Sequence, residues 1–99
     1  MENGYKILWT NHALSELKHT YEHIEKFWTA KELKRLAVEI ERTLKLISTN
    51  PELFPIDINL NCRRAVILKL NTIYYRKKNN YVEILSFYAN RQNPDNRKV

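Results

Sequence analysis

The first third of the chain changes from a short apolar run to apolar positions at regular intervals. Tyr5 to Trp9 is a run of strand-forming residues, and Thr10, which follows it, has a side chain suited to capping a helix. Apolar residues then recur every three or four positions, at Leu14, Leu17, Tyr21, Ile24 and Trp28. This spacing predicts an amphipathic helix. The charged residues between them are predicted to face water: Glu16, Lys18, Glu22 and Lys26.

A second helix is predicted to begin within about two residues of the first. Thr29 and Glu32 have the spacing of a capping box, in which each side chain bonds the other residue's backbone N–H. The apolar positions of this helix are Leu33, Leu36, Ala37, Ile40, Leu44 and Ile47. Asn50-Pro51 ends it, because proline cannot continue the hydrogen-bond ladder. Two helices with so short a joint are predicted to form an antiparallel hairpin.

Three apolar segments follow a loop over residues 51–61. They are predicted to be strands, at Arg63 to Leu70, Thr72 to Lys78 and Tyr81 to Tyr88. Asn79-Asn80 predicts a two-residue type I′ turn, because asparagine tolerates positive φ. This turn would place Arg76 opposite Glu83 and Tyr74 opposite Leu85.

If Leu70-Asn71 is also a two-residue turn, with Lys69 opposite Thr72, the two faces of the sheet can be predicted. The face assigned to the helices carries Val66, Leu68, Ile73, Tyr75, Val82 and Ile84, with Arg64 at its margin. The other face carries Arg63, Ala65, Ile67, Lys69, Tyr74, Arg76, Lys78, Tyr81, Glu83, Leu85 and Phe87. An apolar patch on that second face, rimmed by cations, is typical of a surface that a partner covers.

Composition and charge narrow the class of protein. Ninety-nine residues with 43% apolar content are enough for one domain, with a core over residues 5–90 and a polar tail over residues 91–99. Residues 1–50 hold eight Lys/Arg against seven Asp/Glu, and residues 51–99 hold nine against four, within a net charge of +6. Such an excess favours an anionic partner. A single cysteine and short apolar runs predict a cytoplasmic protein with no disulfide and no membrane span.

Four stretches resemble the RelE/ParE superfamily of bacterial toxins. They are YKILWTNHALSEL, NPELFP, RRAVILKLNTIYYR and VEILSFYANRQNP, in that order, and they cover nearly the whole chain. The resemblance implies an α+β fold of the order β-α-α-β-β-β, with a helical hairpin packed on one face of a small, mainly antiparallel sheet. It also implies the toxin of a type II toxin-antitoxin module, neutralised by a cognate antitoxin. The antitoxin would then cover the surface formed by Ile67, Tyr74, Arg76, Leu85 and Phe87.

The superfamily has two branches, and the C-terminal residues favour one of them. RelE-like toxins are metal-independent ribonucleases that cut mRNA in the ribosome, and they often carry a Tyr or His after the arginine of the last strand. Residues 92–99 contain neither, although Arg64 and Arg91 fall where that branch has arginines. ParE-like toxins inhibit DNA gyrase and have no hydrolytic site, and the segment NRQNP resembles their C-terminal motif. We therefore expect a ParE-like gyrase inhibitor.

Site residues follow from this resemblance. The target-binding cations are expected to be Arg63, Arg64, Lys69 and Arg91. If the chain is instead a RelE-like mRNA endonuclease, its catalytic residues would be Arg64, Tyr88 and Arg91. A third reading is a protein of the toxin fold that has lost activity and only binds a partner. Charge at Arg63 and Arg64 is also typical of a strand edge protected against aggregation.

Two further groups have the chemistry of a site, but neither is assigned one. His19 and His23 have the i, i+4 spacing of a zinc pair and share a helix face with His12 and Glu16, yet no third ligand with a supporting neighbour is evident. Cys62 adjoins Arg63, but a reactive thiol needs a neighbouring base. We expect no metal and no cofactor.

Overall fold

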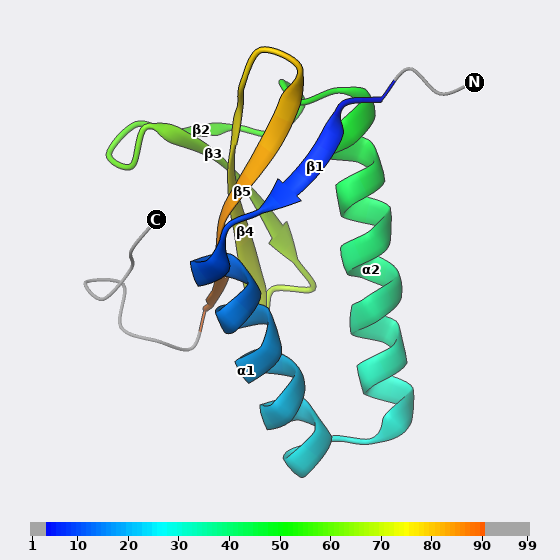
Figure 1. The fold of residues 1–99 in the computed structure, drawn as a ribbon. Coiled ribbons are helices and arrows are strands. Elements are labelled where there is room, and N and C mark those ends of the chain that lie inside the picture. The colour runs from blue at the N-terminus through cyan, green and yellow to red at the C-terminus, as the bar shows by residue number, and fades with distance from the viewer. Residues whose placement is uncertain (1–3, 91–99) are drawn as a thin grey trace.

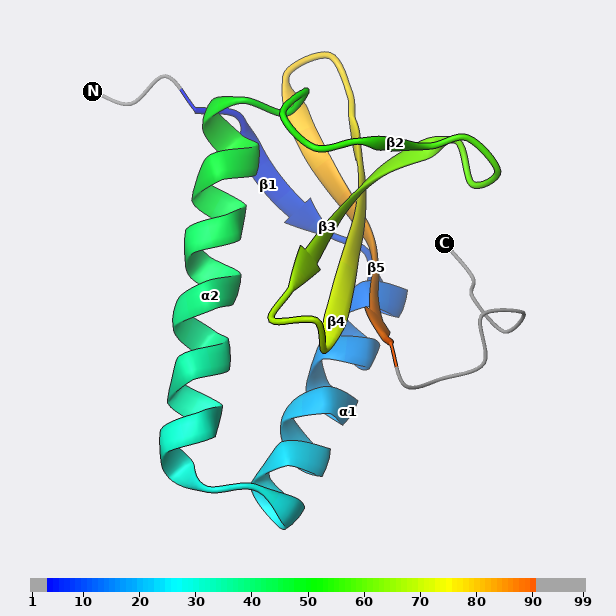
Figure 2. The ribbon, with the colours of Figure 1, turned by 180° about the vertical axis from the view of Figure 1, so that it is seen from behind.

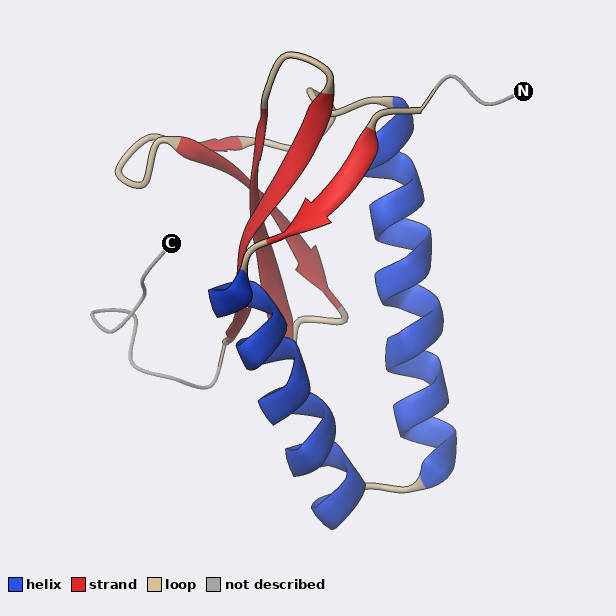
Figure 3. Ribbon diagram, in the orientation of Figure 1, coloured by secondary structure: helices blue, strands red, loops and turns tan. Residues whose placement is uncertain are grey.

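In a computed structural model, which describes residues 4–90, a pair of helices packs against a twisted sheet (Figures 1 and 3). The elements are β1 (Lys6–Trp9), α1 (Asn11–Phe27), α2 (Ala30–Thr49), β2 (Ile56–Asp57), β3 (Cys62–Ile67), β4 (Asn71–Lys77) and β5 (Tyr81–Ala89). This order confirms the predicted α+β arrangement. The two-residue strand β2 lies inside the segment predicted to be loop.

Both predicted helix caps are present. The Thr10 hydroxyl accepts a hydrogen bond from the Ala13 N–H at 3.1 Å, which fixes the start of α1 directly after β1. Thr29 and Glu32 form the reciprocal capping box of α2, with the Thr29 N–H donating to Glu32 Oε1 at 2.9 Å. The two helices are therefore joined by only Trp28 and Thr29, and they diverge from this joint along the sheet (Figure 1).

The strand order is β1-β5-β4-β3-β2, with β1 parallel to β5 and every other pair antiparallel (Figure 2). The main core lies between this sheet and the helices. Its buried members are Ala13, Ile24, Leu36, Ile40, Ile47, Ala65, Ile67, Ile73, Tyr75, Val82, Ile84 and Phe87. Four of these, Ile73, Tyr75, Val82 and Ile84, confirm the sheet residues predicted to face the helices.

The register of β4 and β5 agrees with the prediction only near their turn. Arg76 lies opposite Glu83, as predicted, and the Lys78 N–H donates to the Tyr81 carbonyl at 2.7 Å to close the loop. The turn is not type I′, because neither Asn79 nor Asn80 has a positive φ. Beyond Tyr75 the register shifts, so that Tyr74 pairs with Ser86 and not with Leu85. This irregularity is a β-bulge, and it moves the rest of β5 by one position.

The connection between β3 and β4 was also predicted wrongly. Ile67 pairs with Asn71, so the loop consists of the three residues Leu68 to Leu70. Thr72 pairs with Val66, whereas the predicted two-residue turn would pair it with Lys69. The register of β3 on β4 therefore differs from the prediction by three residues. Because side chains alternate between faces, a shift by an odd number of residues moves every side chain of the strand to the other face. Val66, predicted to be core, is 55% exposed as a result.

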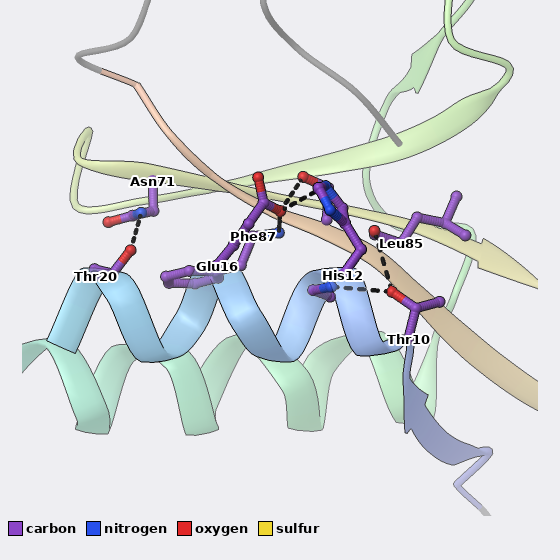
Figure 4. Close-up of polar contacts among 9 residues, drawn as sticks. Thr10, His12, Glu16, Thr20, Asn71, Leu85 and Phe87 are labelled. Atoms are coloured by element: carbon purple, nitrogen blue, oxygen red, sulfur yellow. Dashed lines mark hydrogen bonds and ion pairs between the residues drawn. The ribbon is translucent and has the colours of Figure 1, made fainter. Parts of the chain in front are cut away.

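Helix α1 completes the edge of β5 that β1 leaves uncovered. β1 ends at Trp9, whereas β5 continues past its last partner Ile84 to Ala89. The Thr10 hydroxyl donates to the Leu85 carbonyl at 3.3 Å, and Glu16 Oε1 accepts from the Phe87 N–H at 2.8 Å (Figure 4). Side chains of the cap and first turns thus supply the hydrogen bonds that a neighbouring strand would make.

Glu16 is consequently not the water-facing residue that the helical spacing predicted. The same Oε1 atom accepts from the Ser86 hydroxyl at 2.6 Å and lies 3.3 Å from Nε2 of His12. Farther along the helix, the Asn71 amide donates to the Thr20 hydroxyl at 3.4 Å. The polar face of α1 therefore joins the helix to the sheet through buried or half-buried hydrogen bonds (Figure 4).

Candidate functional surfaces of the sheet

The sheet face turned away from the helices, called the outer face here, carries its own buried cluster. Cys62, Tyr74, Leu85 and Tyr88 form it, and Leu60 packs against them. The rings of Tyr74 and Tyr88 meet edge to face, with their centroids 6.5 Å apart. Tyr74 and Leu85 therefore lie on the predicted side of the sheet, but they are only 1% and 7% exposed.

The other two apolar residues predicted for that patch are on the opposite face. Ile67 and Phe87 belong to the core beneath the helices, and the ring centroid of Phe87 lies 6.3 Å from that of Trp9. The three-residue β3–β4 loop reverses the facing of Ile67, and the bulge in β5 reverses that of Phe87. The apolar residues predicted to form the exposed patch, Ile67, Tyr74, Leu85 and Phe87, are therefore all buried.

Arg64 and Tyr88, two of the three residues proposed for a nuclease, do share the outer face. Arg64 is the direct cross-strand partner of Tyr74, and Tyr88 is the partner of Thr72 one step farther on. Both residues thus border Tyr74. The third residue, Arg91, lies outside the described residues.

Arg63 has a different role, because its side chain is committed to the loop after α2. Its guanidinium donates to the Phe54 carbonyl at 2.8 Å and approaches the Glu52 carbonyl at 3.4 Å. Tyr75, its cross-strand partner, donates through its hydroxyl to the Pro51 carbonyl at 2.7 Å. Burial raises the pKa of this phenol to about 12, although the positive charge of Arg63 lowers it in part. Arg63 and Tyr75 together hold the loop against the sheet.

Arg76 lies on the surface near the β4–β5 turn, beside Cys62. Of its basic neighbours, Lys77 lies 5.2 Å from the ring centre of Tyr5, and Lys78 lies 3.9 Å from Glu83. Burial raises the pKa of the Cys62 thiol, Asp57 raises it further, and Arg76 opposes both. The thiol therefore stays protonated at neutral pH and is not an activated nucleophile.

Lys69 lies in the β3–β4 loop, at the other end of β3 from Arg63. There it lines a hollow together with Trp28, Leu68 and Leu70, next to the joint between the two helices. The cations expected to contact one target are thus divided among separate places on the molecule. Sequence reasoning missed this hollow, because Trp28 continues the apolar stripe of α1 and reads as a core residue.

The described residues, 4–90, contain neither a cluster of metal ligands nor a membrane-spanning helix. Within that range, no group of three or more His, Cys, Asp or Glu side chains could hold a metal ion. Neither α1 nor α2 has an apolar stretch long enough to cross a membrane.

Comparison with known proteins places this fold. A solved structure titled "Chromosomal ParDE TA system from P. aeruginosa" superposes with a TM-score of 0.70 at 15% sequence identity, covering 89% of this chain and 98% of that one. A family model described as "ParE toxin of type II toxin-antitoxin system, parDE" matches residues 7–94. No curated protein sequence matches the chain. The fold is thus shared with a chain of that ParDE system. The match over residues 7–94 shows that the chain belongs to the ParE toxin family.

Proposed function

We propose that the chain inhibits DNA gyrase in the cytoplasm, and that a cognate antitoxin neutralises it. The observation that carries this proposal is the match to the ParE toxin family over residues 7–94. The similar solved structure comes from a ParDE system, which agrees with a two-gene module. Gyrase is the target that the family assignment favours.

Within this proposal, Arg64 is the cation best placed to contact the target. It is half-buried on the outer face beside Tyr74, so its stem is held while its planar guanidinium can bind a carboxylate or phosphate. Arg91 keeps its proposed role on the sequence alone. Arg63 is better explained as a structural residue, because loop carbonyls occupy its guanidinium. For the antitoxin, Arg76 is the exposed member of the predicted contact set.

The second candidate is a RelE-like mRNA endonuclease, which acts on ribosome-bound mRNA. The observation in its favour is that Arg64 and Tyr88 border the same tyrosine on the outer face. Cleavage by a 2′-hydroxyl needs a base, an acid and positive charge near the phosphate. In the described part of the chain, every histidine belongs to α1, so a tyrosine would have to serve in proton transfer at Arg64.

Induction of the chain in bacteria, with and without the neighbouring antitoxin gene, tests the proposal. We expect growth arrest that the antitoxin relieves, with DNA-damage signalling within minutes and a late fall in translation. Primer extension on cellular mRNA at the same times should show no codon-phased cuts. Early phased cuts would overturn gyrase in favour of the endonuclease, and absence of arrest would favour an inactive binding protein.

Substitution of one arginine sharpens this test. Arg64→Gln should weaken growth arrest, because it removes the proposed contact with the target. Arg42→Gln is the matched control, since Arg42 is a cation on α2 with a side chain 71% exposed. Equal toxicity of the two variants would remove Arg64 from the proposed target surface.

A further inference from the structure

The joint between α1 and α2 meets the β3–β4 loop at a hollow with an apolar lining. Trp28, Leu68 and Leu70 contribute the apolar side chains, and Lys69, Arg35 and Glu32 contribute charged ones. A second hollow adjoins it and shares Trp28, Lys69 and Leu70. This surface lies on the helical side of the molecule, apart from the outer face.

Trp28 is the largest apolar group at this hollow, and it has no place in either buried cluster. Its backbone N–H donates to the Ile24 carbonyl at 2.7 Å at the end of α1, and the residue is 37% exposed. Phe27, the residue before it, is 70% exposed. Tryptophan is enriched among the residues that contribute most to protein interfaces. A half-exposed indole at the edge of a hollow is therefore a suitable anchor for a partner.

The backbone beside Trp28 is held in an unusual conformation. Leu68 and Lys69 have φ angles of 53° and 64°, in the left-handed region that side-chain-bearing residues seldom adopt. Asn90 holds the loop in this form, since its N–H donates to the Leu70 carbonyl at 2.9 Å and its amide to the Lys69 carbonyl at 3.2 Å. Local strain of this kind is concentrated at binding and switch regions. It presents the loop residues at the mouth of the hollow.

The charges around the hollow favour an acidic partner. Lys69 and Arg35 are the cations, and Glu32 is the one carboxylate among the lining residues. Glu32 already accepts the Thr29 N–H at 2.9 Å as part of the capping box. A segment carrying carboxylates would therefore meet two cations against one carboxylate, and Oε1 of that carboxylate is already turned to the Thr29 N–H. A second copy of this chain is a poor occupant, because each copy has a net charge of +6.

We propose that this hollow is a docking site for an acidic, amphipathic segment of the cognate antitoxin. A large apolar side chain of that segment rests against Trp28, and its carboxylates face Lys69 and Arg35. The inference depends on the proposed function, since it assigns a surface to the antitoxin that the family implies. Ile67 and Phe87 were expected to contact the antitoxin but are buried, and the hollow offers an exposed apolar surface in their place.

Binding of purified antitoxin to the whole chain, measured by surface plasmon resonance, tests the docking site. Trp28→Ala should weaken binding by about tenfold or more, mainly through faster dissociation and at every salt concentration. Lys69→Gln should slow association several-fold at low salt, and the effect should vanish at about 1 M salt, where charges are screened within about 3 Å. Lys69→Gln keeps the aliphatic stem and adds no new strain at its positive φ.

Two control variants have the same chemistry but lie outside the hollow. Ile58→Ala truncates a residue that is 87% exposed, in the loop between β2 and β3 at the opposite end of the molecule (Figure 2). Arg42→Gln neutralises an exposed cation on α2. Both should bind antitoxin as the parent does. Circular dichroism and urea unfolding establish that each variant is folded. If Trp28→Ala does not fold, the double variant Arg35→Gln with Lys69→Gln takes its place.

Cellular assays separate the possible outcomes. Trp28→Ala should still arrest growth, but antitoxin at a level that protects against the parent should no longer relieve the arrest. If Trp28→Ala loses toxicity yet binds antitoxin normally, the hollow belongs to the target surface and the docking proposal is wrong. Unchanged binding in all hollow variants also overturns it, while the proposed function stands. If the parent itself neither arrests growth nor binds antitoxin, the proposed function fails and the docking site fails with it.

Discussion

Glu16 Oε1 accepts a hydrogen bond from the backbone N–H of Phe87, at 2.8 Å across the edge of the sheet. A helix side chain thus takes the place of a strand partner where β1 has ended and β5 continues. The same oxygen accepts the Ser86 hydroxyl at 2.6 Å. This contact fixes α1 against the end of β5.

Removal of the Glu16 carboxylate should destabilise the fold. Glu16→Ala leaves the N–H of Phe87 and the hydroxyl of Ser86 without their charged acceptor, at a cost of about 1.5 to 3 kcal/mol in the free energy of unfolding. Glu16→Gln should lose less, since its amide oxygen still accepts. Glu25→Ala, at an exposed position on the same helix, should stay within about 0.5 kcal/mol of the parent. Urea unfolding measures all three, and equal stability of Glu16→Ala and Glu25→Ala would mean that the Glu16 carboxylate does not stabilise the end of β5.

The facing of β5 and β3 can be tested by a pair of truncations. Phe87→Ala should lower the free energy of unfolding by about 3 to 5 kcal/mol, because its ring is 1% exposed in the core under the helices. Val66→Ala should change it by no more than about 0.5 kcal/mol, because Val66 is 55% exposed. The reverse order in thermal or urea unfolding would mean that the faces are those predicted from the sequence.

The helices and their boundaries could be predicted from the sequence because local rules determine them. The capping box of Thr29 and Glu32 is a contact three residues apart, and its chemistry is visible in the residue types. The pairing of Arg76 with Glu83 was predictable for the same reason, since a two-residue loop determines the register next to it.

The facing of β3 and of the end of β5 could not be predicted, because it depends on two irregularities with no sequence signal. Leu68 and Lys69 adopt left-handed φ angles that neither residue type favours, and the bulge in β5 inserts one residue among apolar neighbours. Each of these changes moves side chains to the other face. The contact of Glu16 with the sheet was missed because helical spacing shows only which residues share a face. It does not show that β5 extends beyond β1, where its Phe87 N–H needs an acceptor.

Burial of Tyr75 should make stability depend on pH in the alkaline range. Its pKa rises from an ordinary 10.0 to about 12 in the folded chain, so the folded state holds its proton more tightly than the unfolded state. This contribution is complete below pH 10 and is lost as pH rises through 12. At pH 11 the loss amounts to roughly 1.4 kcal/mol.

The variant Tyr75→Phe lacks this phenol but keeps every other group that titrates at alkaline pH. The difference between parent and variant therefore reports the contribution of Tyr75 alone. At pH 8 the variant should be less stable than the parent by about 1 kcal/mol, because it lacks the hydrogen bond to the Pro51 carbonyl. Urea unfolding at pH 8 and pH 11 should show this gap closing as pH rises. A gap that is constant or widens would contradict burial of the Tyr75 hydroxyl.

We propose that this ParE-family chain acts on gyrase and is controlled by an antitoxin. The decisive experiment is a supercoiling reaction with purified gyrase, relaxed plasmid and ATP, in which the chain is added alone or premixed with equimolar antitoxin. The chain alone should block supercoiling and trap linear, gyrase-linked DNA, and antitoxin should restore supercoiling. Full gyrase activity with excess folded chain, alongside cleavage of ribosome-bound mRNA by the same preparation, would contradict it.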